Sequence, residues 1–289
     1  MGSQIWPVSF FVNGQQLSGS SSFPVTASDP DAAAYIDLLQ KYDEAELESG
    51  VQDAINTFVV TLKNNNLWAN VVHMQLLVGA RTLEGIAVPL KGATPTLYGF
   101  SMSDYNRREG LLGNGVDSYI NSNVSMSSIF NAEGRYYIAR LKRGSILNSV
   151  YIGASGIATN TGSVLLGIGG TQTTIRQRVV MPETTSNDNS LRHDLDGVYG
   201  AAKPNGANHI SLYPNINGSG VFTVATNPSN RNIYVFANNR NGAATNHSNG
   251  RIGLYSFGDY SSTTATDFLN FRTAIDTLFS SLASATLTS

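Results

Sequence analysis

Two amphipathic helices, separated by a long run of short β segments, constrain this chain more than any other feature. One apolar stripe recurs at helical spacing and consists of Val51, Ala54, Ile55, Phe58, Val59 and Leu62. A second stripe near the end of the chain consists of Phe268, Phe271, Ile275, Leu278, Phe279 and Leu282. Between the stripes, the apolar period changes from helical spacing to two. This order predicts a β-rich domain with helices packed at both ends.

The sequence divides into three parts. Residues 1–27 form an arm, in which alternating apolar residues meet an Asn13-Gly14 turn signal and then a serine-rich linker. This arm is either a strand added to a neighbouring subunit or an edge strand of the main domain. Residues 28–70 form a helical segment, and residues 71–289 form a β-sandwich domain that ends in the C-terminal helix.

Local signals predict where the helices begin. Asp29-Pro30 combines a helix-capping residue with a proline suited to the first helical position. Ser49 and Gln52 have the spacing of a capping box for a second helix. Either Thr264 or Thr266 is expected to cap the last helix.

Many short segments with alternating apolar residues predict an antiparallel β-sandwich or jelly roll, a mainly β fold. The predicted strands are 72–78, 85–90, 96–102, 135–141, 149–153, 163–168, 174–181, 208–213, 220–225, 232–237 and 251–257. Asn-Gly pairs supply turn signals at Asn114-Gly115, Asn205-Gly206, Asn217-Gly218, Asn241-Gly242 and Asn249-Gly250. The polar stretch 183–207 is predicted to be a surface loop.

Charge and composition argue against several classes of protein. The net charge is −2 with scattered basic residues, so the positive field that a nucleic-acid groove requires is not expected. The sequence contains no cysteine, which rules out disulfides and thiolate metal sites. No stretch approaches the roughly 20 apolar residues of a membrane span, and the N-terminus has no signal-peptide pattern.

Several short blocks resemble a module of bacteriophage virion proteins, especially those of phages that infect Bacteroidetes. The striped helix at 49–79 ends in LKNNNLW and leads into a strand, although Val78-Gly79-Ala80 replaces the Val-Gly-Gly of the module. Residues 105–115 and 117–123 (DSYINSN) resemble its next stretches, and 251–258 followed by a helix resembles its C-terminus. In order and spacing, the resemblance extends over about residues 49–282.

The resemblance implies a concanavalin-like or laminin G-like jelly roll carried on a virion as an appendage, fibre, spike or capsid decoration. It therefore implies a non-enzymatic structural protein located on the virion. Residues 1–48 do not share the resemblance, and we expect the N-terminal arm and helices to contact other virion proteins. Homo-oligomers are expected for such parts, and the outward loops are expected either to meet host-surface glycans or simply to cover the shell. The alternative is a secreted carbohydrate-binding or carbohydrate-active protein on the same fold.

The sequence predicts no catalytic site, metal or cofactor. Glycoside hydrolysis needs two carboxylates that face each other across the sugar, and none of the predicted strands carries such a pair. The nearest approach to a calcium site is the set of loop carboxylates Asp188, Asp194 and Asp196, which lacks the closing bidentate glutamate. The four histidines do not have the spacing of metal ligands. His73 and His209 are instead expected to pair with backbone groups.

One polar stretch has a composition typical of sugar recognition, which uses amide hydrogen bonds beside an aromatic ring. The candidate carbohydrate-binding residues there are Asn238, Asn239, Arg240, Asn246, His247 and Tyr255. Asn-rich turns are also ordinary connectors, and that interpretation is favoured over a binding site.

Overall fold

The computed structural model describes backbone and side chains for residues 21–129, 135–142, 149–155, 196–202, 230–259 and 264–287, with only the backbone at 265. It also describes the backbone of the strands at 11–12, 15–16, 143, 164–171, 174–180, 187–189, 203, 209–213 and 216–220. Strands β1 (Phe11–Val12) and β2 (Gln15–Gln16) pair with Val12 opposite Gln15. The predicted Asn13-Gly14 turn itself lies outside the described residues.

Helix α1 (Pro30–Asp43) begins where the sequence predicted. The carboxylate of Asp29 accepts hydrogen bonds from the backbone amides of Asp31 and Ala32, as expected of a helix N-cap. Residues 21–28 run beside the helices. The backbone amide of Thr26 donates to Gln52 Oε1, in the second helix, at 2.9 Å. Residues 21–27 of the predicted arm therefore lie against the helical layer.

Helix α2 (Ser49–Asn64) buries the whole predicted apolar stripe. The predicted capping box is wrong, because Glu48 is the N-cap residue and makes no capping hydrogen bond through its side chain. Gln52 is buried instead, and its Nε2 donates to the carbonyl of Leu47 at 3.0 Å. The Oε1 of Gln52, the atom that a capping box would use, accepts from the backbone amide of Thr26.

Helix α5 (Ala265–Ser284) is capped by Thr264, which forms a capping box with Asp267. Its apolar stripe packs against α2 and the first sheet, as predicted. The ring of Phe271 lies edge-on to Tyr136 at a centroid distance of 5.4 Å. No helix in the described part of the chain is both long enough and apolar enough to span a membrane.

Most of the remaining described residues belong to two sheets. The first sheet contains β3 (Val71–Leu76), β5 (Tyr105–Asn106), β6 (Gly110–Leu112), β8 (Arg135–Arg143), β13 (Gly197–Lys203), β14 (His209–Tyr213), β15 (Ile216–Gly220) and β19 (Arg251–Asp259). Its order is β15-β14-β13-β8-β19-β6-β5, with β3 also paired to β19.

The second sheet contains β4 (Thr96–Tyr98), β7 (Tyr119–Ser125), β9 (Val150–Ser155), β10 (Val164–Thr171), β11 (Thr174–Val180), β12 (Asn187–Asn189), β16 (Asn232–Val235), β17 (Asn238–Arg240) and β18 (Ala243–Thr245). Its order is β12-β11-β10-β9-β16-β7-β4, with the β17–β18 hairpin beside β9. Among the described strands, β17 pairs with β9 in parallel and the other pairings are antiparallel. The fold is therefore mixed, with two antiparallel-rich sheets and helices at both ends.

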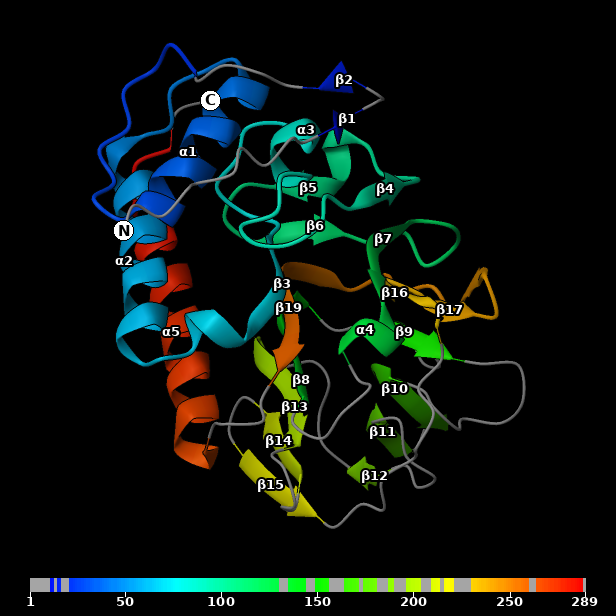
Figure 1. Cartoon of the computed structure of the whole chain (residues 1–289). Coiled ribbons are helices and arrows are strands. Elements are labelled where there is room, and N and C mark those ends of the chain that lie inside the picture. Colours follow the sequence, from blue (N-terminus) through cyan, green and yellow to red (C-terminus); the bar gives the residue numbers. More distant parts are fainter. Residues whose placement is uncertain are drawn as a thin grey trace.

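The elements are layered. Helices α1, α2 and α5 lie on one side, the first sheet lies beside them, and the second sheet lies farther from the helices (Figure 1). Strand β19 is buried along nearly its whole length, because its two faces meet different layers. Residues of both sheets belong to one apolar core, including Ile120 and Ile152 of the second sheet and Tyr137 of the first.

Short elements complete the connections. They are η1 (Trp68–Asn70), α3 (Leu83–Ile86), η2 (Met102–Asp104) and α4 (Met126–Ile129). The strand predicted at 85–90 is wrong, because Thr82 caps a helical turn there by accepting from the backbone amide of Gly85. The carboxylate of Asp43 in turn binds Thr82.

The predicted surface loop at 183–207 contains β12 and β13, so that prediction is wrong over these residues. Strand β13 pairs with β8 and β14, and Val198, Tyr199, Ala201 and Ala202 are buried. A Cβ at Gly200 would lie 2.5 Å from the carbonyl oxygen of Tyr137. The strand is buried on both faces, so it lacks the alternation of apolar and polar residues that marks a strand with one solvent-exposed face.

The Asn-Gly signals have mixed outcomes. Asn241 and Gly242 both have positive φ angles, 53° and 93°, and join β17 to β18 as predicted. Asn217-Gly218 lies within β15, so the turn predicted there is wrong.

The Gly-rich segment at 167–170 continues β10, with a register shift between Leu166 and Gly167.

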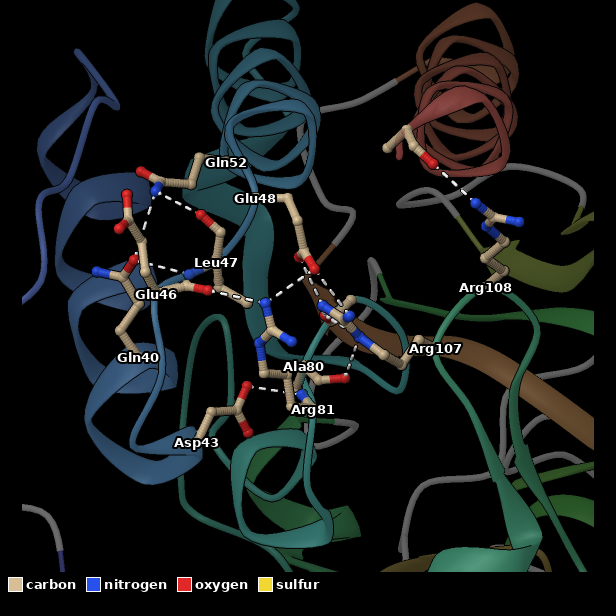
Figure 2. Close-up of polar contacts among 12 residues, drawn as sticks. Gln40, Asp43, Glu46, Leu47, Glu48, Gln52, Ala80, Arg81, Arg107 and Arg108 are labelled. Carbon is tan, nitrogen blue, oxygen red and sulfur yellow. Dashed lines mark hydrogen bonds and ion pairs between the residues drawn. The ribbon is translucent and has the colours of Figure 1, made fainter. Parts of the chain in front are cut away.

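Partly buried charges join the helices to the first sheet. Arg107 binds both carboxylate oxygens of Glu48, at 3.0 and 2.8 Å, and Arg81 binds the same carboxylate at 2.9 Å (Figure 2). Arg107 also donates to the carbonyls of Gly79 and Ala80. Asp43 accepts from the backbone amide of Arg81, and burial is the main cause that raises the pKa of this carboxyl. We call Asp43, Glu48, Arg81 and Arg107 the helix–sheet joint.

Candidate functional site

Three tyrosine rings stack across neighbouring strands of the second sheet. Tyr98 of β4 lies on Tyr119 of β7 with ring centroids 4.5 Å apart and ring planes 12° from parallel. Tyr119 lies next to Tyr234 of β16 at 4.8 Å and 30°. The three residues are far apart in the sequence, and only the pairing of the strands brings them together.

The alternation of β7 explains why these rings lie outside the core. Ile120, Ser122 and Val124 are buried, whereas the intervening residues of this strand are more exposed. In an antiparallel sheet, residues directly opposite each other share a face. Tyr98 is opposite Tyr119, Thr96 is opposite Asn121, and Asn121 is opposite Tyr234.

We call the outer surface of these three strands the tyrosine face, made of Thr96, Tyr98, Tyr119, Asn121, Asn232 and Tyr234. The stacking leaves the rings unequally accessible. Tyr119 has a ring on either side, and Tyr234 is only 9% exposed. Tyr98 is 42% exposed and belongs to β4, the last strand in the order of the sheet. The free ring surface of this face is therefore the side of Tyr98 away from Tyr119.

The phenols of Tyr119 and Tyr234 remain uncharged at neutral pH. Burial is the main cause that raises the pKa of Tyr119 and of Tyr234, and the neighbouring tyrosines raise both further. A neutral phenol both donates and accepts a hydrogen bond. Beside the phenols lie the amide of Asn121, whose Oδ1 accepts from the backbone amide of Asn123, and the hydroxyl of Thr96, which accepts from Asn123 Nδ2.

Two of the sequence-predicted sugar-binding residues lie at the end of this face. His247 is half-buried, meets the ring of Tyr119 edge-on at 6.1 Å, and has its Nδ1 3.2 Å from the carbonyl oxygen of Ser118. Asn246 precedes it and is exposed. The adjoining loop is held by Asn114, whose Oδ1 accepts from the backbone amides of Val116, Asp117 and Ser118.

The predicted asparagines of β17 have structural roles. Asn238 is buried, and its Nδ2 donates to Ser155 Oγ at 3.1 Å. Asn239 is buried too, donating to the carbonyl of Asn232 and accepting from the amide of Gly242. These bonds hold the hairpin against its neighbours. Arg240 is exposed on the same hairpin.

Tyr255 does not form the predicted aromatic platform, because it is fully buried. Its hydroxyl lies 3.2 Å from His73 Nε2, and the His73 ring stacks on both Tyr255 and Phe257. The prediction that His73 pairs with backbone groups is therefore wrong. Burial lowers the pKa of His73 to about 3, so its ring is neutral at physiological pH.

The predicted calcium-loop carboxylates do not gather in the described structure. Asp196 forms ion pairs with Arg140 and with Lys142 Nζ, the latter at 2.6 Å. Asp188 lies on β12, of which only the backbone is described, and Asp194 lies outside the described residues. Within the described ranges, no three His, Asp or Glu side chains form a cluster that could hold a metal ion.

Sequence reasoning did not find the tyrosine face. The sequence pattern that could have indicated it is the Tyr-x-Asn-x-Asn alternation at 119–123. This pattern places one aromatic and two amide side chains on the solvent-exposed face of a strand. The other two tyrosines belong to strands whose pairing partners cannot be read from local spacing.

Comparisons with known proteins extend only to the fold. No protein-family model and no curated protein matches the sequence. The structure is similar to Trypanosoma rangeli sialidase in complex with sialic acid, with a TM-score of 0.51 and 11% identity over 78% of this chain and 39% of the sialidase. A mutant of that sialidase displaying trans-sialidase activity matches equally, at 10% identity. The chain thus spans about two fifths of the length of these proteins.

Domain 4 of AbnA, an extracellular arabinanase from Geobacillus stearothermophilus, was solved in complex with arabinotriose. It matches 70% of this chain and 98% of its own length at 11% identity, with a TM-score of 0.45. At such identities, the sialidase similarity identifies a shared fold and transfers no activity.

Proposed function

We propose that this protein is a non-catalytic glycan-binding protein on a lectin-like jelly-roll sandwich and that the tyrosine face is its binding surface. The observation that carries the proposal is the stacked row of Tyr98, Tyr119 and Tyr234 on the outer face of a sheet. Exposed aromatic rings beside amides and hydroxyls are suited to sugars, because a sugar has both apolar C–H surfaces and hydroxyls.

Each tyrosine has a distinct part in this proposal. The free side of the Tyr98 ring stacks against the C–H surface of a sugar. Tyr119 and Tyr234 hold that ring in place and present their hydroxyls beside it. Asn121, between Thr96 and Tyr234 in the sheet, offers its Nδ2 as a donor to sugar hydroxyls, because its Oδ1 accepts from the backbone amide of Asn123.

We propose that the protein binds glycans and does not hydrolyse them. Strands β4, β7 and β16 contain no aspartate or glutamate. Glycosidases in most families need two carboxyl groups on either side of the scissile bond. The similarity to sialidase favours a carbohydrate-related role, so the rival function is hydrolysis. Incubating the protein with the glycans it binds and separating the products by size tests this rival; shorter products would support it.

We also propose that the protein is displayed on a virion as a homo-oligomer, contacting other virion proteins through its N-terminal arm and helices. The sequence resemblance supports this setting, and the fold similarity does not bear on it. Antibody labelling of purified particles, viewed by electron microscopy, tests it. Labelled particles are expected, and unlabelled particles that also lack the protein by mass spectrometry would refute it.

The binding proposal is tested with a glycan array followed by calorimetry of the best ligand. Tyr98→Ala is expected to weaken binding at least about tenfold, corresponding to about 1.4 kcal/mol. Val72→Ala, which shortens an exposed apolar side chain on the first sheet, is the matched control and should bind normally. Equal affinity of Tyr98→Ala and the native protein would refute the tyrosine face as the site.

A further inference from the structure

The tyrosine face is uncharged throughout. Strands β4 (TLY), β7 (YINSNVS) and β16 (NIYV) contain no Asp, Glu, Lys, Arg or His. The face therefore offers a ligand phenols, amides and hydroxyls, together with one free ring surface at Tyr98. Such groups supply hydrogen bonds and apolar contact, but no counter-ion for an acidic sugar.

Charged side chains that border the face are hydrogen-bonded within the protein. Arg231, which immediately precedes β16, donates to the Oδ1 of Asn241 at 2.6 Å. Asp117, two residues before Tyr119, accepts from the Nδ2 of Asn114 at 2.7 Å. Each bond ties its side chain to a neighbouring loop through a neutral amide, so the Arg231 cation, which opposes the burial-driven rise in the pKa of Tyr234, and the Asp117 anion border the face with opposite charges.

We propose that the ligand of the tyrosine face is an uncharged glycan chain of at least two sugars, bound without ion pairing. This inference rests on the proposed glycan-binding function and names its ligand class. A carboxylated or sulfated sugar placed over these strands would lose water without gaining a cation from β4, β7 or β16, which is unfavourable. Charged ligands thus bind more weakly than neutral ligands of the same backbone.

The length of the ligand follows from the geometry of the row. The ring spacings of 4.5 and 4.8 Å spread the three hydroxyls over three strands, which is wider than one sugar ring. Tyr98 lies on the last strand of the sheet, so a chain that stacks there is free to continue past the edge. An internal segment of a polysaccharide fits this open surface better than a terminal sugar does.

The experiment uses matched polysaccharides that differ in charge. Hydroxyethylcellulose is compared with carboxymethylcellulose, and dextran and pullulan with their carboxymethyl derivatives, by affinity gel electrophoresis and calorimetry. Binding to at least one neutral polymer is expected, with Kd changing less than about twofold between about 0.02 and 0.5 M NaCl. Its charged derivative should bind more weakly, and oligosaccharides should compete better than the monosaccharide.

The outcomes separate this inference from the function on which it rests. If the protein binds a charged derivative better than the neutral polymer, with affinity that falls as salt rises and with loss in Tyr98→Ala, the inference is wrong and the glycan-binding function stands. If no polymer or array glycan binds, both are wrong. Tyr98→Phe keeps the ring and is expected to retain salt-independent binding, which shows that a loss in Tyr98→Ala reflects the ring and not misfolding.

Discussion

Tyr98 and Tyr119 lie directly opposite each other on neighbouring antiparallel strands, and their rings stack 4.5 Å apart at an angle of 12°. Tyr119 is thereby fixed between two rings, since Tyr234 lies on its other side at 4.8 Å. The central ring has little access to a ligand except through its hydroxyl. Substitutions at this position therefore separate the contribution of the hydroxyl from that of the stacking.

Tyr119→Phe keeps the stacked row and removes the central hydroxyl. We expect the Kd for a neutral glycan to rise about fivefold, which corresponds to one hydrogen bond of about 1 kcal/mol. Tyr119→Ala also removes the support of Tyr98, so binding should fall further and the free energy of unfolding should fall by about 1–2 kcal/mol. Calorimetry and urea denaturation measure the two effects. Native affinity in Tyr119→Ala would contradict the role of the row.

Glu48→Gln tests the helix–sheet joint. The substitution leaves the guanidinium groups of Arg81 and Arg107 largely buried without their shared carboxylate. We expect the free energy of unfolding to fall by about 3 kcal/mol, as when one partner of a buried ion pair is removed. Glu46→Gln is the control, because Glu46 is exposed in the same loop and should change stability by less than about 0.5 kcal/mol. Equal effects of the two substitutions would refute the structural role of Glu48.

Gly110→Ala should destabilise the first sheet strongly. Gly110 has a φ of 104°, and a Cβ there would lie 2.1 Å from the carbonyl oxygen of Ile252. We expect a loss of at least about 2 kcal/mol, since the backbone of β19 would have to move. Gly242→Ala shares a positive φ but meets nothing closer than 3.8 Å, so its cost should stay near 1 kcal/mol. Urea denaturation distinguishes steric conflict from backbone strain, and similar losses in both variants would rule out the conflict.

His73 is expected to make stability depend on pH. Above a pH of about 6.5, this ring is neutral in both the folded and the unfolded chain. Burial lowers the pKa of folded His73 to about 3, so between these values the unfolded chain binds a proton that the folded chain does not. Stability is therefore full above about pH 6.5 and falls as the pH decreases, by up to about 1.4 kcal/mol per pH unit.

His73→Phe and His73→Gln both remove this titration. Their free energies of unfolding, measured by urea denaturation at about pH 7 and about pH 5, should fall less steeply with decreasing pH than that of the native protein. The two variants differ in packing and share the loss of the titrating ring, so they should show the same slope. A native slope in both would show that the buried ring does not control the pH dependence.

Much of the helical layer was predictable because its signals are local. The stripe from Val51 to Leu62 and the Thr264 cap each lie within a few residues of chain, and both are present in the structure. The predicted Ser49–Gln52 capping box does not form, because the side chain of Gln52 is buried and its Nε2 donates to Leu47 and Gln40. Competition of this kind depends on neighbours that spacing does not reveal.

The strand at 197–203 was missed for a related reason. Strand β13 is buried by layers on both sides, so its residues are small or apolar without alternation. Tyr255 was predicted at a site because it closely follows the Asn-rich stretch at 238–250. The pairing of β19 with β3 places it beside His73 inside the core.

The sequence by itself determined the two apolar helix stripes, the caps of α1 and α5 and the tight turn at Asn241-Gly242, because each depends on residues within one or two helical turns. Only the tertiary structure decided the tyrosine face. Its three rings come from separate strands, and the register that aligns Tyr98 with Tyr119 and Asn121 with Tyr234 is set by long-range hydrogen bonding and by the burial of Ile120 and Val124 beneath it.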